Sequence, residues 1–249
     1  MPHSADVSSF APARRTNCLL ARLPSDVAAR LEPELTTIPG KARQVLYNQG
    51  DRIEYVYFPN DCVASVTSVL ATGAMVETAT VGDEGMVGIE AIFAERAVST
   101  GETIVQVPGT TIERLSAAAF RAEIARHGVF ERRVGRYAQA FLAQVMQTAA
   151  CNALHPVQER CCRWLLQTHD RVHGQDFALS HEFLGVMLGV RRSTVTVVAG
   201  GLQSAGLIKY AHGRVRVIDR RGLEEASCEC YCLIREQFDR LECDTAASA

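Results

Sequence analysis

The chain has 249 residues, of which 47% are hydrophobic and 22% are charged, with a formal net charge of −2. These values are typical of a soluble globular protein with room for two domains, and no apolar run approaches the length that crosses a bilayer. The nine cysteines are odd in number and lack the regular spacing of a secreted disulfide scaffold. We therefore expect mostly free thiols, a cytoplasmic location and no membrane partner.

The N-terminal part of the chain predicts an arm followed by two short helices. Residues 1–17 are rich in Ser, Ala, Pro and Arg and lack the apolar core of a signal peptide, so we expect a flexible arm. Residues 18–37 carry leucines at roughly helical spacing. Pro24 and Ser25 divide this stretch into two helical pieces, the second capped by Ser25.

From Ile38 to Leu115 the hydrophobic period changes to two, which is typical of strands. The β-rich segments are Gln44–Tyr47, Ile53–Phe58, Val63–Leu70, Met75–Val81 and Thr103–Val107, separated by turn signals. Many short strands at this spacing favour a sandwich or a barrel. The loop Gly82–Gly88 interrupts the strands, and a short apolar helix over Ile89–Phe93 follows it.

Residues 116–154 are predicted to be helical again. Ser116 caps a short helix over residues 117–127, and a run without proline then extends from Val129 to Leu154. Its wide apolar stripe includes Val134, Tyr137, Ala138, Phe141, Val145, Thr148 and Ala149. A long helix between two domains favours packing against its copy in a homodimer, and packing on its own barrel is the alternative. His155 ends the run because a residue before proline disfavours the α region, and a helix over residues 156–172 follows.

Residues 180–218 carry the strongest functional signal. They predict a helix, a tight turn, a second helix and a short basic hairpin. Ser180 is a natural N-cap, and Gly189 permits the left-handed backbone that ends a helix. The second helix begins near Arg191, turns Val195, Val198 and Leu202 inward, and leaves Arg192, Ser193, Thr196 and Val197 near its exposed N-terminal end. Arginine and small hydroxyls at this place suit a recognition helix, although any αα-hairpin has the same outline.

The hairpin that follows favours DNA binding over a plain αα-hairpin. Residues 209–218 alternate around a turn at His212-Gly213, with Val215 and Val217 on one face and Arg214 and Arg216 on the other. Residues 151–221 hold ten Arg or Lys against five Asp or Glu, whereas the whole chain is slightly negative. The positive charge therefore lies where the helix-turn-helix lies, as phosphate binding requires.

In order and spacing, about residues 18–223 resemble the Crp/Fnr family of bacterial transcription regulators. The resemblance is carried by Gly50, the loop Val81–Gly88, the segment Gly189–Val195 and the segment Gly206-Leu207-Ile208 before the wing. It implies an α+β fold, with an N-terminal β-barrel or jelly-roll sensor domain, a long dimerisation helix and a winged helix-turn-helix domain. The expected bounds are 18–127, 128–154 and 155–223, with an acidic, cysteine-containing C-terminal helix and tail over 224–249.

The resemblance also implies a function without catalysis. A homodimer would bind a palindromic operator on double-stranded DNA, with RNA polymerase as a further partner. The expected DNA-binding residues are Ser180, Arg191, Arg192, Ser193, Thr194, Thr196, Lys209, Arg214 and Arg216, with Arg192 on guanine. Ser193 and Val197 replace the family's usual Glu and second Arg, so the half-site should differ from that of the cyclic AMP regulator. The alternative is a ligand- or redox-sensing module whose winged helix mediates protein contacts.

The segment that should bind an effector departs from the family's pattern. Members that bind cyclic AMP carry Gly-Glu-Leu-Gly followed by Arg-Ser, whereas here Ile89 replaces the acid and Thr100 replaces the arginine. A buried phosphate without that arginine would cost on the order of several kcal/mol, so we expect no dependence on cyclic AMP. The candidate effector residues are Gly85, Gly88, Glu90, Arg96 and Thr100, with Arg96 as the alternative phosphate ligand. The effector stays unknown, and no cofactor is assigned.

The sequence has an unusual C-x-C-x-C segment at Cys228, Cys230 and Cys232. If residues 221–242 form one helix, Cys228 and Cys232 share a face and Cys230 points away. This spacing is not a standard ligand set for zinc or an iron–sulfur centre, and free cysteine usually behaves as a small hydrophobe. We therefore assign no metal site.

Overall fold

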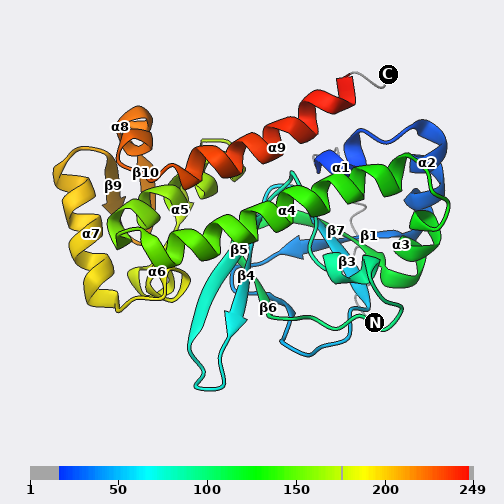
Figure 1. Cartoon of the computed structure of the whole chain (residues 1–249), viewed down its shortest axis with the longest axis horizontal. Helices are drawn as coiled ribbons and strands as arrows, with labels where there is room; N and C mark the ends of the chain where they lie inside the picture. Colours follow the sequence, from blue (N-terminus) through cyan, green and yellow to red (C-terminus); the bar gives the residue numbers. More distant parts are fainter. Residues whose placement is uncertain (1–16, 175, 247–249) are drawn as a thin grey trace, which may run out of the picture.

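The structure is a computed structural model that describes residues 17–174 and 176–246. Apart from Asn17, the arm predicted over residues 1–17 lies outside the described residues. The fold is α+β, with a β domain, a long helix and a winged helix-turn-helix domain in chain order, as predicted. Figure 1 shows α4 (Val129–Leu154) running the length of the molecule, with the β domain on one side and the winged domain at its C-terminal end.

Two antiparallel sheets form the β domain. One sheet has the order β1-β7-β3, from β1 (Leu35–Gly40), β7 (Gly109–Ser116) and β3 (Tyr55–Pro59). The other has the order β2-β6-β4-β5, from β2 (Val45–Tyr47), β6 (Glu102–Val107), β4 (Val63–Val69) and β5 (Met75–Val81). Strands far apart in sequence are neighbours, as in a jelly roll. The core is built from alternating strand residues, among them Val56, Phe58, Val105, Ile112 and Leu115.

The N-terminal segment is only partly helical, in contrast to the prediction over residues 18–37. Helices α1 (Cys18–Ala21) and α2 (Ser25–Leu31) and the 3-10 turn η1 (Glu32–Glu34) form, but Thr36 and Thr37 lie in β1 and pair with β7. β-Branched residues fit a pleated sheet better than a helix, which explains the difference. The predicted cap at Ser25 is also wrong, because Pro24 occupies the N-cap position.

Two helices follow the β domain with bounds close to those predicted. Helix α3 (Ala117–Ile124) begins after Ser116, whose hydroxyl accepts a hydrogen bond from the Ala119 amide at 3.1 Å. Helix α4 has the predicted bounds and ends at His155. Its buried face includes Val134, Tyr137 and Thr148, which pack within the chain. The apolar stripe predicted as a dimer interface is therefore largely covered by other parts of the same chain, namely the β domain and the C-terminal helix.

The C-terminal segment forms two helices instead of the one expected over residues 221–242. Helix α8 (Arg220–Glu225) ends where the Ser227 hydroxyl donates to the Glu224 carbonyl at 2.8 Å, and α9 (Cys230–Ala246) then begins and packs along α4 (Figure 1). A side-chain bond of this kind competes with helix continuation. Because of the break, Cys228 and Cys230 are both buried and Cys232 is exposed. The expected shared face of Cys228 and Cys232 is wrong.

The C-terminal domain has the elements of a winged helix-turn-helix. Its helices are α5 (Val157–Arg171), α6 (His181–Leu188) and α7 (Arg192–Ser204), and its small sheet has the order β8-β10-β9, from β8 (Phe177–Ala178), β10 (Arg214–Val217) and β9 (Ile208–Ala211). The core includes Trp164, Leu184, Leu188, Val195 and Val215. Within the described ranges, no single helix is long and apolar enough to cross a membrane; α6 and α7 meet that test only as a joined pair bent by 106°.

The C-terminal domain docks on the β domain and α4 through a largely buried polar seam. The seam consists of Ser65, Glu77, Glu84, Gln106, Gln144, Arg163, Gln167, Thr168 and Arg171. The Arg171 Nε donates to Glu84 Oε1 at 2.8 Å, and the Ser65 hydroxyl donates to Glu77 Oε2 at 2.6 Å. Burial raises the pKa of Glu77 to about 7, against the opposing charges of Arg163 and Arg171.

Candidate DNA-binding site

Helices α6 and α7 are held in a helix-turn-helix by local features of the sequence. The Ser180 hydroxyl accepts a hydrogen bond from the Phe183 amide at 3.1 Å and so caps the N-terminus of α6. This predicted DNA-binding residue therefore stabilises the helix. Gly189 ends α6 with a left-handed φ of 64°. Gly185 must be small, because a Cβ there would lie 2.9 Å from the Val190 carbonyl oxygen. The turn therefore fixes α7 at a steep angle to α6.

The N-terminal end of α7 presents an exposed, uncommitted surface. Arg191 is the N-cap residue, and Arg192 and Ser193 open the helix with exposed side chains. Neither arginine has an ion-pair partner within the described part of the chain. Thr194 is half-buried, and the Val197 side chain is 75% exposed one turn further on. Protruding arginines beside a small hydroxyl and an apolar side chain can hydrogen-bond base edges and contact a thymine methyl group.

Sequence reasoning missed His181, which orients the recognition helix. Its Nδ1 lies 3.0 Å from the Thr196 hydroxyl, which donates in turn to the Arg192 carbonyl at 3.1 Å. The imidazole stacks on Tyr210 with 4.4 Å between ring centroids. Burial, with a contribution from Arg192, lowers the pKa of His181, so the ring is neutral at neutral pH. The contact spans 15 residues, and no local pattern signals it.

The wing carries arginines whose side chains are already bonded within the chain. His212 and Gly213 both have positive φ, which gives the hairpin its tight turn. Arg214 and Arg216 are exposed, as predicted. In the antiparallel register of β10 and β9, Arg216 lies opposite Lys209. Arg216 also forms an ion pair with Asp176 at 2.6 Å, and this hydrogen bond lowers the pKa of Asp176.

Arg214 shares the same partner, since its Nη2 donates to the Asp176 carbonyl oxygen at 2.7 Å. Arg214 and Arg216 therefore both lie beside Asp176, whose carboxylate partly neutralises their positive charge. Lys209 is exposed on the neighbouring strand. The predicted DNA-binding residues thus form two groups: Arg191, Arg192, Ser193, Thr194 and Thr196 on α7, and Lys209, Arg214 and Arg216 on the wing.

A second exposed surface follows one face of α4. Residues 135, 139, 142, 146, 149 and 153 are all exposed and alternate in steps of four and three, which is the spacing of a coiled-coil seam. Leu142 and Met146 at its centre have 58% and 66% of their surface exposed. Phe141, in contrast, is half-buried and packs on Tyr137 with ring centroids 5.9 Å apart. We name the exposed residues the α4 outer face.

Of the five candidate effector residues, Glu90 and Thr100 are joined by a hydrogen bond. The Thr100 hydroxyl donates to Glu90 Oε1 at 3.4 Å. Gly85 lies directly against the ring of Tyr137, where a Cβ would collide with it, and Gly88 lies against Tyr47. Arg96 is exposed. The buried Tyr137 therefore occupies the space beside this loop.

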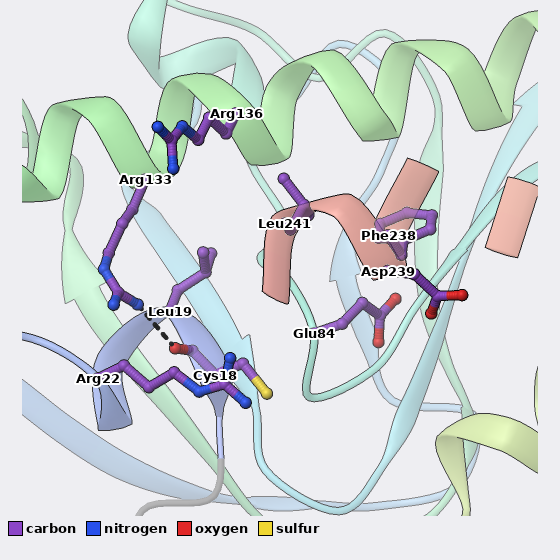
Figure 2. Close-up of a pocket in the computed structure, with 9 residues that line it drawn as sticks. All are labelled: Cys18, Leu19, Arg22, Glu84, Arg133, Arg136, Phe238, Asp239 and Leu241. Atoms are coloured by element: carbon purple, nitrogen blue, oxygen red, sulfur yellow. Dashed lines mark hydrogen bonds between the residues drawn. The ribbon is translucent and has the colours of Figure 1, made fainter. Parts of the chain in front are cut away.

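Two cavities lie at α9 and contain none of the candidate effector residues. One cavity of about 150 Å³ is lined by Arg22, Arg133 and Arg136 and also by Glu84 and Asp239 (Figure 2). It is smaller than the ligand pockets of about 300–1,000 Å³ that proteins commonly use. A neighbouring cavity of about 410 Å³ is lined by more carboxylates than arginines. Neither suits a cyclic phosphate.

A third cavity, of about 320 Å³, lies beside Tyr47, Tyr55 and Tyr57 in the β domain. It also meets Arg52, but Asp51 and Glu54 line it as well. Its rim shares Tyr47 with the surroundings of Gly88 and includes neither Glu90 nor Thr100. The candidate effector residues therefore do not form one pocket with it.

Residues 159–226 match the family model of the Crp-like helix-turn-helix domain, so the chain carries a domain of this kind. Solved structures with the same fold include FixK2 from Bradyrhizobium japonicum, with 20% identity and a TM-score of 0.59, covering 78% of this chain and 98% of that one. The c-di-GMP-responsive regulator CLP from Xanthomonas campestris has 16% identity and a TM-score of 0.62, covering 78% and 99%.

A CRP-family transcriptional regulator from Thermus thermophilus has 20% identity and a TM-score of 0.62, covering 77% of this chain and 96% of that one. At these identities the likeness concerns the fold. No curated protein matches the sequence significantly. The chain thus combines a Crp-like helix-turn-helix domain with the overall fold of Crp/Fnr regulators.

Proposed function

We propose that this chain, a DNA-binding transcription regulator of the Crp/Fnr type, binds a palindromic operator as a homodimer without a cyclic nucleotide. The observation that carries the proposal is the exposed N-terminal end of α7. Arg192 and Ser193 project from the first turn of a helix whose other face is fixed in the domain core by Val195 and Leu202. A recognition helix enters the major groove with this end.

Within the site, α7 and the wing have different tasks. Arg192 has the geometry for a bidentate contact to the O6 and N7 of guanine, and Ser193 lies beside it for a neighbouring base edge or phosphate. Arg191, Lys209, Arg214 and Arg216 carry the phosphate contacts, which set the position and not the sequence. DNA is the principal partner, RNA polymerase is a further one, and the place of action is the cytoplasm.

The α4 outer face is the proposed dimer interface. Its heptad spacing and its exposed Leu142 and Met146 suit a parallel helix pair with the second copy. Because α7 lies at the C-terminal end of α4, such a pair places two recognition helices on one side of the dimer (Figure 1). The operator would then carry two half-sites about one helical turn, roughly 34 Å, apart.

Independence from cyclic nucleotides rests on the β domain. Tyr137 packs against Gly85 and donates its hydroxyl proton to the Met86 carbonyl at 2.8 Å, so the space behind the loop is filled. Thr100 engages Glu90 and offers no positive charge to a phosphate. The protein is therefore expected to bind its operator as purified, and calorimetry with cyclic AMP should show no micromolar binding.

Selection from randomised DNA tests the function. The purified protein should enrich an inverted repeat, and footprinting should show two protected major-groove faces about one turn apart. Enrichment of no sequence, with all DNA bound equally, would remove sequence-specific regulation and leave the alternative of a sensing module.

The dimer is tested by the double variant Leu142→Asp/Met146→Asp. It buries two carboxylates in the proposed interface without partners, so sedimentation at micromolar concentration should show a monomer and operator affinity should fall strongly. Leu70→Asp is the matched control, since Leu70 is 60% exposed in the turn after β4 and should leave the dimer intact. A double variant that stays dimeric would move the interface elsewhere.

A further inference from the structure

Three thiols and one imidazole converge where α4 ends and α9 begins. Cys151 is buried in the last turn of α4, and His155 is the residue that caps it. Cys228 and Cys230 come from the segment between α8 and α9. The Cys151 and Cys228 sulfurs are 3.5 Å apart, and the Cys230 sulfur is 3.4 Å from His155 Nδ1. All four ligand atoms lie within 4.8 Å of one another.

We propose that Cys151, His155, Cys228 and Cys230 form a binding site for one zinc ion. A tetrahedral zinc ion with Zn–S near 2.3 Å and Zn–N near 2.0–2.1 Å places its sulfurs about 3.8 Å apart and its nitrogen about 3.5 Å from each sulfur. The measured separations of 3.5 and 3.4 Å lie close to these values. Three cysteines with one histidine are a common ligand set of structural zinc sites.

The compactness of the cluster argues for one ion and against a four-iron cluster. In such a cluster each thiolate binds a different iron atom, which keeps the sulfurs further apart than four ligands around one ion. Here all four donors fit within 4.8 Å. Soft thiolates in a tetrahedral set also disfavour magnesium and calcium, which take oxygen ligands.

Two further side chains orient the ligands as a metal site requires. The outer nitrogen of the imidazole, Nε2, lies 3.3 Å from Glu229 Oε2, which leaves Nδ1 to face the sulfurs. A carboxylate behind a metal-bound histidine fixes the ring and its tautomer. The Gln147 amide donates to the Cys230 sulfur at 3.0 Å, which suits a thiolate. A thiol packed as a small hydrophobe needs neither partner.

The site lies where the winged domain is connected to the rest of the chain, so a bound ion would restrict the motion of that domain. Cys151 and His155 lie just before Pro156, where the chain leaves α4 and enters α5 of the DNA-binding domain. Cys228 and Cys230 lie just after that domain, at the start of α9. One ion would therefore tie together both connections between the winged domain and the rest of the molecule, and limit rotation of the domain about Pro156.

The site could not be predicted from the spacing of its residues in the sequence. Cys151 and His155 are four residues apart at the C-terminal end of α4, but their partners are more than 70 residues further along the chain. Cys232, which completes the C-x-C-x-C segment, is exposed and does not belong to the cluster. It therefore serves as a natural control.

The test begins with the unmodified protein, purified under reducing conditions. Metal analysis should find one zinc per chain, and replacement by Co²⁺ should give the intense visible bands of tetrahedral cobalt with the near-ultraviolet bands of thiolate ligation. Absence of zinc together with an octahedral or absent cobalt spectrum would overturn the proposal. Bound iron in place of zinc, or a Cys151–Cys228 disulfide under these conditions, would also overturn it.

Variants then assign the ligands. Cys228→Ser and His155→Ala should each lose most of the zinc, and Glu229→Gln should weaken zinc binding by about 10–100-fold while preserving tetrahedral coordination. Cys232→Ser should bind zinc like the parent. If Cys228→Ser does not fold, Glu229→Gln and the cobalt spectrum of the parent still decide the outcome. Equal zinc affinity in Cys232→Ser and Glu229→Gln, both with full loading, would count against the assigned histidine.

Discussion

The outer surface of the winged domain and the polar seam on its inner side use similar residues for opposite purposes. On the outer surface, Arg191 and Arg192 are exposed and have no ion-pair partner among the described residues. In the seam, Arg163 and Arg171 are almost fully buried, and Arg171 bonds Glu84, Gln144 and Gln167. The fold thus leaves Arg191 and Arg192 free to bind DNA and commits Arg163 and Arg171 to the seam.

The difference predicts that seam variants change stability and surface variants change DNA binding. Breaking a buried charge pair leaves a partner without compensation, whereas removing an exposed arginine leaves nothing unsatisfied. The only tryptophan, Trp164, lies on α5 next to Arg163 and reports on unfolding of the seam.

The largest effect is expected from Arg171→Met, which retains the volume and removes the charge. It leaves the Glu84 carboxylate, with only 20% of its side chain exposed, without its cation. Unfolding by urea, followed by Trp164 fluorescence, should show a loss of about 3–5 kcal/mol. The double variant with Glu84→Gln should recover much of this loss. The comparison fails if Arg171→Met is as stable as Arg221→Met, whose side chain is 89% exposed on α8.

Glu77 gives the seam a pH dependence. Its pKa of about 7 in the folded protein lies above the ordinary value of 4.5, so the folded state favours the protonated acid. The contribution to stability is full below pH 4.5 and is lost as the pH rises to 7, by on the order of 3 kcal/mol at about 1.4 kcal/mol per pKa unit. The parent should lose stability as the pH rises from 5 to 8, whereas Glu77→Gln should not. The free energy of unfolding of Glu77→Gln minus that of the parent should therefore be larger at pH 8 than at pH 5. A stability difference that is the same at both values would contradict this.

The smallest change in stability is expected at the wing, where Asp176 partly neutralises the exposed arginines. Asp176→Asn frees Arg216 from an exposed ion pair, so stability should change little. Affinity for DNA of any sequence should rise, and the slope of log affinity against log salt should steepen by about one. Glu225→Gln is the control, since it frees Arg221 from a similar pair on α8. Identical salt slopes in both variants would show that the wing does not reach the phosphates.

The sequence predicted those parts whose signals are local. Ser116 and Ser180 cap their helices, Gly189 ends α6, and α4 has the expected bounds, because each depends on neighbours within a few residues. The exposed arginines of α7 and the wing followed from the same periodicity.

Features that depend on distant contacts were not predictable in this way. Pairing with β7 draws Thr36 and Thr37 into a strand, and the β domain covers Val134 and Tyr137, which had suggested a dimer interface. Asp176 reaches the wing across 40 residues. Only the fold brings Cys151 to Cys228 and Glu84 to Arg171.

The central claim, that α7 reads DNA sequence, is tested most directly at Arg192. The measurement is the ratio of affinities for the selected operator and a scrambled duplex, in the parent, Arg192→Ala and the control Arg221→Ala. This ratio corresponds to a free energy of discrimination between the two duplexes. Loss of a bidentate guanine contact should reduce that free energy by about 1–3 kcal/mol in Arg192→Ala only. Both variants should retain the fold and the dimer. A ratio in Arg192→Ala equal to that of the parent would contradict the assignment of α7 as the recognition helix.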